Sequence, residues 1–360
     1  MHLPPPVHGA ANVGKSIHDS KRINTLFDCH YVNLSIAASI SDVGHFRLGK
    51  VLDFYRLLRL IRRKVKQVRP SLVYITPNAK GGAFFKEFVI VTMLKKMGCK
   101  VVAHYHNKGV SKKQDSWLYN AFYQHFFKDL RVILLSESLY SDVKKYIDRK
   151  DVYICPNGIS PKGESKKRDK KSPNDEPRLL FLSNLIESKG VFVLLDALKI
   201  LKDKGLLFTC DFVGGESKEI DAQLFNREIS KRGLIEQVVY RGKKYGDEKY
   251  MVYQNADIFV FPTYYDNECF PLVLLEAMEQ GLPCVTTNEG AISDIIKDGV
   301  NGLIAERNDV CSLAEKIEIL FDDKELCLKM GEKGHQLFVD FFTLDVFESK
   351  MCEILEDLVR

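Results

Sequence analysis

Two glutamates in one segment are the residues of this chain best suited to act on a ligand. Glu268 and Glu276 lie eight positions apart in residues 266–281, DNECFPLVLLEAMEQG. Pro271 and Gly281 predict a helix between them, because proline is tolerated at the first helical position and glycine is favoured just after the last. The free N–H groups of a helix start bind phosphate, and carboxylates accept hydrogen bonds from paired sugar hydroxyls. The segment therefore predicts a site for a ligand that carries both groups, a nucleotide-sugar.

Three further turns place a lysine or glycines directly after apolar segments. Lys189 and Gly190 follow a predicted strand and precede a predicted helix, where an ammonium group and helix N–H groups could meet a diphosphate. Gly214 and Gly215 follow a second predicted strand, and two explanations are equally open: close approach of the backbone to a ligand, or a tight turn. Gly242 follows a third strand in the same way and could border a nucleobase.

A pair of histidines, His104 and His106, closes another predicted strand, at the end where α/β folds bind ligands. Histidines at this spacing can bind a metal, but no carboxylate lies nearby in sequence, so we expect one of them to face a substrate. The acidic triplet at residues 266–268 is not interpreted as a metal site either, because Lys189 and a helix start can neutralise a diphosphate. We predict neither a metal nor another cofactor, and the nucleotide-sugar is a substrate.

Residues 9–16, GAANVGKS, match the phosphate-binding loop G-x-x-x-x-G-K-[ST] of nucleoside triphosphatases. That loop functions only between a buried strand and a helix, whereas here it follows Pro-Pro-Pro-Val-His. No convincing strand that ends in a magnesium-binding aspartate comes soon after it. A triphosphatase therefore stays an unfavoured alternative. Apart from that alternative, Gly9 could still mark a glycine turn that faces a ligand-binding cleft.

The elements that must position these residues are short apolar segments alternating with longer segments of helical pattern. This alternation predicts parallel sheets covered by helices on both faces, the doubly wound α/β class. Ligands in this class bind at the carboxyl ends of the strands. The predicted strands are Leu72–Thr76, Lys100–His104, Val132–Ser136, Val152–Cys155, Arg178–Ser183, Phe208–Val213, Val238–Tyr240, Ile258–Phe261 and Pro283–Thr286, and the helical segments include Gly49–Val68, Phe84–Met97, Leu118–Leu130, Val191–Lys204 and Val310–Phe321.

Length and composition limit the class of protein. A chain of 360 residues with 45% hydrophobic and 28% charged residues is typical of a globular protein with two domains. The net charge of +5 permits an anionic ligand or a membrane surface, and no RNA-binding or zinc-finger pattern indicates nucleic acid. Nine scattered cysteines, none in a C-x-x-C pair, support neither disulfides nor a metal site. No signal peptide or membrane-spanning segment is visible, so we expect a cytoplasmic protein.

Three segments differ from this background. Residues 160–177, SPKGESKKRDKKSPNDEP, are interpreted as a solvated linker between two domains. The chain opens with Met-His-Leu-Pro-Pro-Pro, so the first strand of the fold is expected to be missing, either by truncation or because the fold tolerates its loss. The basic segment 54–69 has helical periodicity, and a surface helix packed against a sheet is favoured over a face that meets anionic lipid. A peripheral membrane contact stays open.

The chain resembles glycosyltransferase family 4, the retaining group with GT-B architecture, over most of its length and most clearly in residues 178–307. The resemblance rests on the E-x7-E element from Glu268 to Glu276 and on three flanking motifs: CPNGI at 155–159, ADIFVFP at 256–262 and GAISDIIKDGVNG at 290–302. It implies two doubly wound, Rossmann-like domains facing across a cleft. The implied division is 1–160 plus 343–360 as the acceptor-side domain, 161–177 as the linker and 178–342 as the nucleotide-sugar-binding domain.

The resemblance also implies a role for each residue. Lys189 would stabilise the departing diphosphate, Glu268 would hold the donor sugar near its reacting carbon, and His106 would face that sugar from the first domain. Glu276 would hold the ribose hydroxyls, and backbone N–H groups of residues 269–273 would meet sugar and phosphate. The predicted substrate-binding residues are Glu276, Asn184, Cys269, Phe270, Pro271, Leu272, Val273, Gly214, Gly215, Gly242 and Gly9.

The chain departs from the family at Asn184, where the family usually has an arginine five residues before the lysine. One charge partner of the phosphates is therefore lost or replaced. The resulting expectation is a metal-independent hexosyltransferase that moves a sugar from a nucleotide-diphosphate sugar to a saccharide or lipid-linked acceptor, in bacterial surface polysaccharide assembly. The alternatives are a catalytically inactive nucleotide-sugar-binding partner of another transferase, and the triphosphatase that would use residues 9–16.

Overall fold

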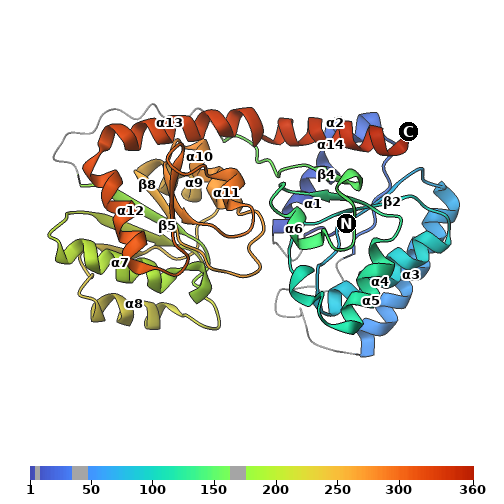
Figure 1. The fold of residues 1–360 in the computed structure, drawn as a ribbon, viewed down its shortest axis with the longest axis horizontal. Coiled ribbons are helices and arrows are strands. Elements are labelled where there is room, and N and C mark those ends of the chain that lie inside the picture. Colours follow the sequence, from blue (N-terminus) through green and yellow to red (C-terminus); the bar gives the residue numbers. More distant parts are fainter. Residues whose placement is uncertain (5–8, 35–47, 163–175) are drawn as a thin grey trace. The chain divides into compact units, whose positions relative to one another are not determined.

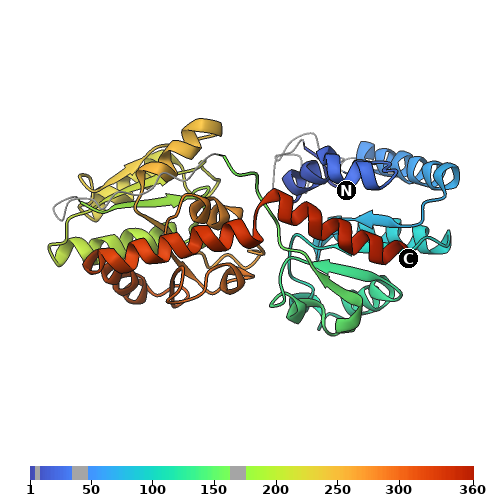
Figure 2. The same ribbon diagram turned by 90° about the horizontal axis from the view of Figure 1, so that it is seen from above.

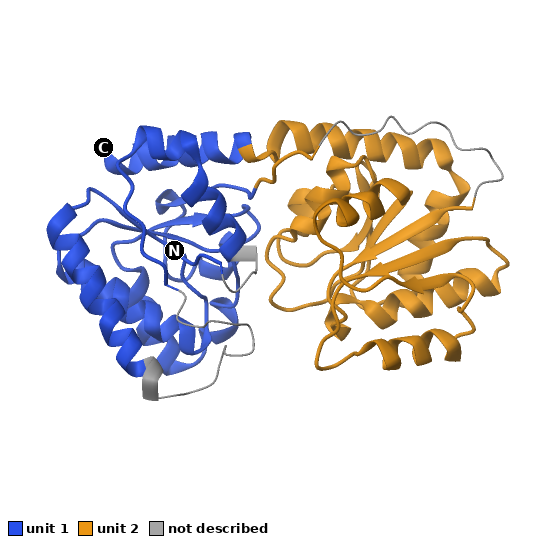
Figure 3. Ribbon diagram, turned by 180° about the vertical axis from the view of Figure 1, so that it is seen from behind, with its two compact units in different colours: residues 1–157, 345–360 blue, residues 158–344 orange. Residues whose placement is uncertain are grey.

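The computed structural model of the chain describes residues 1–4, 9–34, 48–162 and 176–360. These residues form two compact units, coloured separately in Figure 3. The first unit holds residues 1–157 and 345–360, and the second holds residues 158–344. Most of the predicted linker, 161–177, lies outside the described residues.

The first unit is built on a parallel sheet with the strand order β1-β2-β3-β4 (Figure 1). Aromatic side chains of α4 and α5 fill its core, with Phe84, Tyr123 and Phe126 almost completely buried. The elements are α1 Gly9–Asp19, α2 Lys21–Leu26, α3 Leu48–Val68, β1 Val73–Ile75, α4 Gly81–Lys96, β2 Val101–His104, α5 Trp117–Phe127, β3 Arg131–Leu134, α6 Tyr140–Val143, β4 Val152–Ile154 and α14 Leu344–Val359.

The C-terminal helix α14 returns to this first unit and packs between its N-terminal helices and β4 (Figure 2). Arg22 of α2 pairs with Asp345 at 2.7 Å, and the Tyr153 hydroxyl of β4 donates to Asp357 at 2.6 Å. The opposite edge of the sheet, at β1, borders an apolar cavity of about 530 Å³. No strand precedes β1 in the described part of this unit.

The second unit contains a parallel sheet with the strand order β10-β9-β8-β5-β6-β7. Helices α7 and α8 lie along one face, and α10 and α13 along the other (Figure 1). Because the strand order reverses between β5 and β8, this is the point where doubly wound sheets open a crevice for ligands. The elements are β5 Arg178–Leu182, α7 Val191–Asp203, β6 Thr209–Val213, α8 Ala222–Lys231, β7 Val238–Tyr240, α9 Gly246–Asn255, β8 Ile258–Phe261, α10 Leu272–Glu279, β9 Cys284–Thr287, α11 Ile292–Ile295, β10 Gly302–Ala305, α12 Val310–Asp322 and α13 Lys324–Phe341.

The doubly wound α/β prediction is confirmed, and all nine predicted strands are present with ends that differ by at most two residues. One strand was missed. Gly302–Ala305 pairs with β9 and extends the second sheet, but it has only four residues and begins with glycine, a residue that is depleted in strands.

The unfavoured triphosphatase loop at residues 9–16 is not formed, and the possible glycine turn at Gly9 needs correction. Gly9 is the first residue of helix α1, so the motif lies inside a helix instead of forming a loop between a strand and a helix. Lys15 pairs with Asp19 of the same helix at 2.6 Å. Gly14 serves packing, because a Cβ there would overlap with the backbone carbonyl of His2. Neither the glycine turn at Gly9 nor a triphosphatase loop is present.

None of the helices that the structure describes combines the length and the apolar character needed to cross a bilayer.

Candidate active site

Lys189 and Glu268 meet at the reversal point of the second sheet. Lys189 ends a short 3-10 turn, Glu187–Lys189, in the loop after β5, and Glu268 lies in the loop after β8. The ammonium group of Lys189 forms an ion pair with the Glu268 carboxylate, and the two side chains are only 15% and 10% exposed. Lys189 also lies 4.6 Å from the ring centroid of Tyr265, within cation–π range. Two residues predicted from separate turns thus form one partly buried charge pair.

The loops after β5 and β8 can approach this closely because residue 190 is glycine. Gly190 is the N-cap of α7, with φ 86°, a conformation that other residues adopt only with strain. A Cβ on Gly190 would overlap with the carbonyl oxygen of Pro262. The backbone N–H of Tyr264 donates to the Ser188 carbonyl at 2.8 Å and ties the two loops together. Gly190 therefore holds Lys189 at the reversal point.

The start of helix α10 differs by one residue from the prediction. Pro271 is the N-cap, with ψ 111°, and the helix begins at Leu272, so Pro271 is not its first residue. Leu272 and Val273 are the first two helical residues, so their backbone N–H groups have no acceptor within the helix. Cys269, Phe270 and Pro271 are buried, so of the predicted residues 269–273 these three are anchored by their side chains.

Glu276 lies in α10 and is held by two side chains from α9. Lys249 Nζ lies 2.6 Å from Glu276 Oε1, and the Tyr253 hydroxyl donates to Oε2 at 2.8 Å. Burial, with a further contribution from Glu276, raises the pKa of Tyr253 well above its usual range, so this hydroxyl keeps its proton. Neither Lys249 nor Tyr253 was predicted, because no motif spacing connects them to the glutamate.

The glycine turn after β6 is explained by packing against the neighbouring strands. Gly214 has φ 153°, and a Cβ there would overlap with the carbonyl oxygen of Ser183. Its N–H donates to the Gly242 carbonyl at 2.9 Å, which joins the turns after β6 and β7. The side-chain oxygen of Asn184 accepts from the Gly215 N–H at 3.2 Å. A tight turn therefore accounts for these glycines, and ligand approach stays a prediction.

Lys243 lies across the same turn. A Cβ on Gly215 would overlap with Cε of Lys243, so the lysine stem covers this glycine beside the Asn184 side chain. Lys189, Lys249 and Arg307 each pair with a carboxylate, but Lys243 has no ion-pair partner among the residues that the structure describes. Lys243 directly follows Gly242, which was predicted from its place after a strand, but no role was predicted for Lys243 itself.

Arg307 braces the loop that carries the acidic triplet. Its guanidinium donates to the Tyr264 carbonyl and to Asp266, both at 2.9 Å, and lies 3.4 Å from the buried Glu289. Asp266 is therefore engaged in an ion pair. Within the described ranges, no group of three or more His, Cys, Asp or Glu residues could hold a metal ion. Arg307 follows β10, so it was missed together with that strand.

His104 and His106 belong to the first unit. His104 is completely buried, its Nδ1 lies 2.8 Å from the Tyr74 hydroxyl, and the two imidazole centroids are 4.1 Å apart. Burial, and secondarily His106, hold the pKa of His104 well below its usual range. His104 is therefore a neutral residue of the core, which leaves His106 as the residue of this pair expected to face a substrate.

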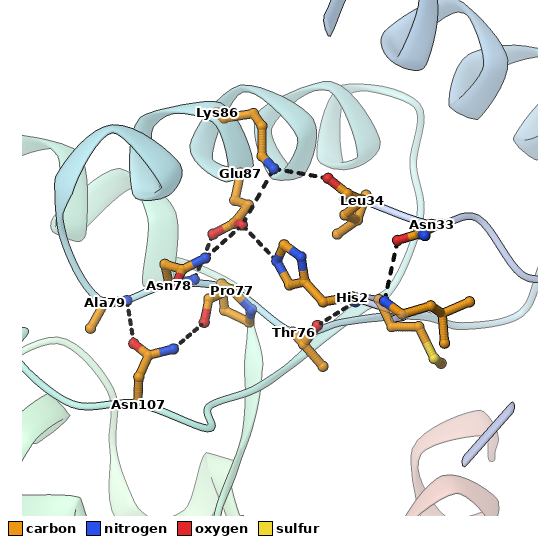
Figure 4. Close-up of polar contacts among 12 residues, drawn as sticks. His2, Asn33, Leu34, Thr76, Pro77, Asn78, Ala79, Lys86, Glu87 and Asn107 are labelled. Carbon is orange, nitrogen blue, oxygen red and sulfur yellow. Dashed lines mark hydrogen bonds and ion pairs between the residues drawn. The ribbon is translucent and has the colours of Figure 1, made fainter. Parts of the chain in front are cut away.

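A polar cluster around Glu87 connects the loops after β1 and β2 (Figure 4). Glu87 of α4 is fully buried and accepts hydrogen bonds from the backbone and side chain of Asn78, with His2 Nε2 at 3.1 Å. Asn107, the neighbour of His106, donates to the Pro77 carbonyl at 3.1 Å and accepts from the Ala79 N–H at 2.6 Å. The loops after β1 and β2 are thus fixed to each other.

Comparison with known proteins bears on the family and the fold of the chain. Residues 162–337, slightly less than half of the chain, match the family model described as glycosyl transferases group 1. O-antigen chain mannosyltransferase C of Escherichia coli is 26% identical over 255 residues, which are 68% of this chain and 66% of that protein. The capsular polysaccharide biosynthesis glycosyltransferase CapM of Staphylococcus aureus is 29% identical over 177 residues, 48% of this chain and 44% of that protein. The chain thus matches less than two thirds of the length of either relative.

Solved structures show the same architecture. A glycosyltransferase from Rickettsia africae superposes with a TM-score of 0.69 at 18% identity, covering 92% of this chain and 86% of that chain. Anabaena HepE, crystallised with UDP, superposes with a TM-score of 0.70 at 18% identity, covering 84% and 82%. We conclude that the chain has the GT-B glycosyltransferase fold and that its residues 162–337 are similar in sequence to the glycosyl transferases group 1.

Proposed function

We propose that this protein is a retaining glycosyltransferase that moves a hexose from a nucleotide-diphosphate sugar to a saccharide or lipid-linked acceptor. The observation that carries the proposal is the Lys189–Glu268 pair with Glu276 close by in sequence, at the strand-order reversal of the unit that matches the family model. The names of the relatives, which concern O-antigen and capsular polysaccharide, support a role in bacterial surface polysaccharide assembly.

We assign the donor site to the second unit. A diphosphate would take the Lys189 ammonium from Glu268 and free that carboxylate for the hydroxyls of the donor sugar. The first N–H groups of α10 would share the diphosphate charge, and Glu276, oriented by Lys249 and Tyr253, would hold the ribose hydroxyls. These groups are the reason for proposing that no metal is needed.

We assign to Lys243 the supply of the positive charge that is missing at Asn184. Asn184 has no charge, and its side-chain oxygen is already bonded to the Gly215 N–H. The Lys243 stem crosses the same glycine, which brings a cation without an ion-pair partner in the described residues to this turn. Lys243 and Lys189 would then share the negative charge that builds on the leaving diphosphate.

In the proposed reaction, the acceptor hydroxyl attacks the anomeric carbon from the face that the diphosphate leaves. The carbon–oxygen bond to the diphosphate breaks as the new glycosidic bond forms, and a leaving phosphate oxygen takes the hydroxyl proton. Such a path depends on positioning more than on a side-chain base. His106 of the first unit is proposed to face the donor sugar. We also propose a cytoplasmic protein with a peripheral membrane contact.

Asn184 also supports a second candidate, a partner protein that binds the donor but transfers nothing. The first test is a thermal-shift panel with UDP, GDP, ADP, dTDP and ATP, each with and without magnesium. A ligand at about a hundred times its dissociation constant stabilises a fold by roughly 2.7 kcal/mol, which is measurable. Stabilisation by one diphosphate without magnesium supports both candidates, whereas a response to magnesium ATP alone contradicts both.

Donor turnover separates the two candidates. With the diphosphate identified, hydrolysis or transfer of the matching nucleotide-sugar above background excludes the inactive partner. Glu276→Gln keeps the shape of the side chain but removes its charge, and we expect turnover to fall at least about a hundredfold, since one group that binds in the transition state contributes roughly 2.7 kcal/mol or more. An unchanged rate in Glu276→Gln would contradict the assigned donor site.

A further inference from the structure

Helix α3 concentrates the positive charge of the chain. Its 21 residues, Leu48–Val68, include seven lysines and arginines and one aspartate, a net charge of +6. The whole chain has a net charge of +5, so the residues outside α3 sum to nearly neutral. Charge gathered on one helix produces a local positive potential at the protein surface.

One side of α3 combines this charge with large apolar side chains. Leu57 and Ile61 are buried on its inner side, and the helix packs beside α4 (Figure 1). On the other side Leu52 is 61% exposed and Tyr55 58% exposed. Positions three, four, seven and eleven residues apart share one side of a helix. We define the outer face of α3 as the exposed residues Leu52, Tyr55, Arg56, Arg59 and Arg63.

The arginines of this face keep their charge available to a partner. Arg56 pairs with Asp53 at 3.0 Å, but both side chains are well exposed, and such surface pairs contribute little. The Arg59 guanidinium lies 5.9 Å from the Tyr55 ring centroid and has no carboxylate partner in the described part of the chain. Arg63 likewise has no carboxylate partner among the described residues.

An anionic bilayer is the partner that satisfies both properties of this face. Amphipathic helices with a basic polar side lie at the membrane interface, where aromatic and aliphatic side chains enter the acyl boundary and arginines meet lipid headgroups. A nucleic acid would explain the arginines but leave Leu52 and Tyr55 exposed to water. An acidic protein would need its own apolar surface as well. A bilayer supplies charge and apolar contact together.

We propose that the outer face of α3 docks the protein onto a bilayer that contains anionic lipids. The proposal deepens the proposed function and rests on it in one respect, since a lipid-linked acceptor would lie in that bilayer. Docking itself needs neither donor nor acceptor. Failure of docking can therefore be distinguished from failure of the transferase assignment.

The test is co-sedimentation of the full chain with vesicles of phosphatidylcholine alone or with about 30% phosphatidylglycerol, the anionic lipid that would attract the arginines. Arg59→Glu/Arg63→Glu reverses two charges on the outer face, and we expect it to lower the partition coefficient at least about tenfold. Lys329→Glu/Lys333→Glu, on exposed positions of α13 at the same spacing, is the matched control and should bind as the unchanged protein does. Leu52→Gln/Tyr55→Gln removes apolar contact without changing charge and should also weaken binding.

Binding only to anionic vesicles, lost in the arginine variant and weakened in the apolar variant, supports the proposal. No binding to anionic vesicles at low salt overturns it, and so does equal loss in the α13 control. Unchanged binding of Leu52→Gln/Tyr55→Gln, with tight binding of a DNA duplex, would identify a polyanion site and overturn the lipid assignment. The thermal shift with the nucleoside diphosphate should be the same in all variants, and it reports on the donor site separately.

Discussion

The carboxylate of Glu276 depends on residues that come from another helix. Tyr253 and Lys249 of α9 precede it by 23 and 27 residues, and both contact it in the second unit. A hydroxyl that donates to a carboxylate fixes the direction of that carboxylate as well as its charge. The orientation of Glu276 is therefore set by α9, although the glutamate motif itself lies in and before α10.

We predict that Tyr253→Phe weakens binding of the nucleoside diphosphate about tenfold, because a hydrogen bond to a charged group contributes roughly 1.5 kcal/mol. Titration calorimetry measures the affinity directly. Tyr250→Phe, on the same helix but with no hydrogen bond to Glu276 in the described structure, is the matched control and should leave affinity unchanged. Equal affinities for the Tyr253 variant and the unchanged protein would mean that the hydroxyl does not orient the carboxylate for binding.

A substitution at Gly214 can test whether the turn after β6 accepts a side chain. Gly214→Ala places a Cβ against the Ser183 backbone and also strains φ, so we expect a loss of roughly 3 kcal/mol or more in the unfolding free energy of the second unit. Gly233→Ala shares a positive φ but has open space, so it should cost only about 1 kcal/mol. Urea unfolding compares the two. Similar losses for both variants would show that the backbone relaxes around Gly214.

At the scale of the elements, the sequence predicted local structure well and pairing poorly. Lys189 and Glu268 were each predicted from their own turn, but they are 79 residues apart, and their contact depends on a strand order that no local pattern encodes. Arg307 was missed because β10 begins with a glycine and becomes a strand only by pairing with β9. The motif at residues 9–16 was rejected as a triphosphatase loop because no apolar strand precedes it, and helix α1 agrees with that rejection, whereas the possible glycine turn at Gly9 was wrong.

Strands β1 and β2 are joined by a contact to the buried His104, and this histidine makes the stability of the first unit depend on pH. Tyr74 of β1 contacts His104 of β2, and burial lowers the pKa of His104 in the folded state. Above the unfolded pKa of about 6.5 neither state binds the proton, so the full stability is present. Below this unfolded pKa the unfolded state binds a proton at His104 that the folded state does not bind, so stability falls as the pH falls.

We therefore predict that the first unit loses about 1 kcal/mol of unfolding free energy between pH 7 and pH 5.5 through His104. Hydrogen exchange of β1 and β2 during urea titration measures this unit separately. His104→Gln should remove this part of the pH dependence, whereas His125→Gln, at an exposed position of α5, should retain it. An identical pH dependence in His104→Gln and the unchanged protein would contradict the assignment.

At the scale of the whole molecule, the chain leaves the first unit after residue 157 and returns to it at residue 345. The second unit is continuous in sequence and holds the residues assigned to the donor, apart from His106. The first unit is not continuous, because its last helix, α14, follows the entire second unit. Folding of the two units therefore depends differently on the C-terminus.

Removal of residues 344–360 should separate the two units experimentally. Phe347, Met351, Ile354 and Leu358 of α14 are buried, and burial of each such side chain contributes roughly 1.5–3 kcal/mol, together about 6–12 kcal/mol. Since a domain is stable by only about 5–15 kcal/mol, the truncated first unit should unfold. The second unit keeps all its strands, so it should resist proteolysis and still bind the nucleoside diphosphate. Loss of nucleotide binding together with the first unit would show that the donor site needs residues beyond 158–344.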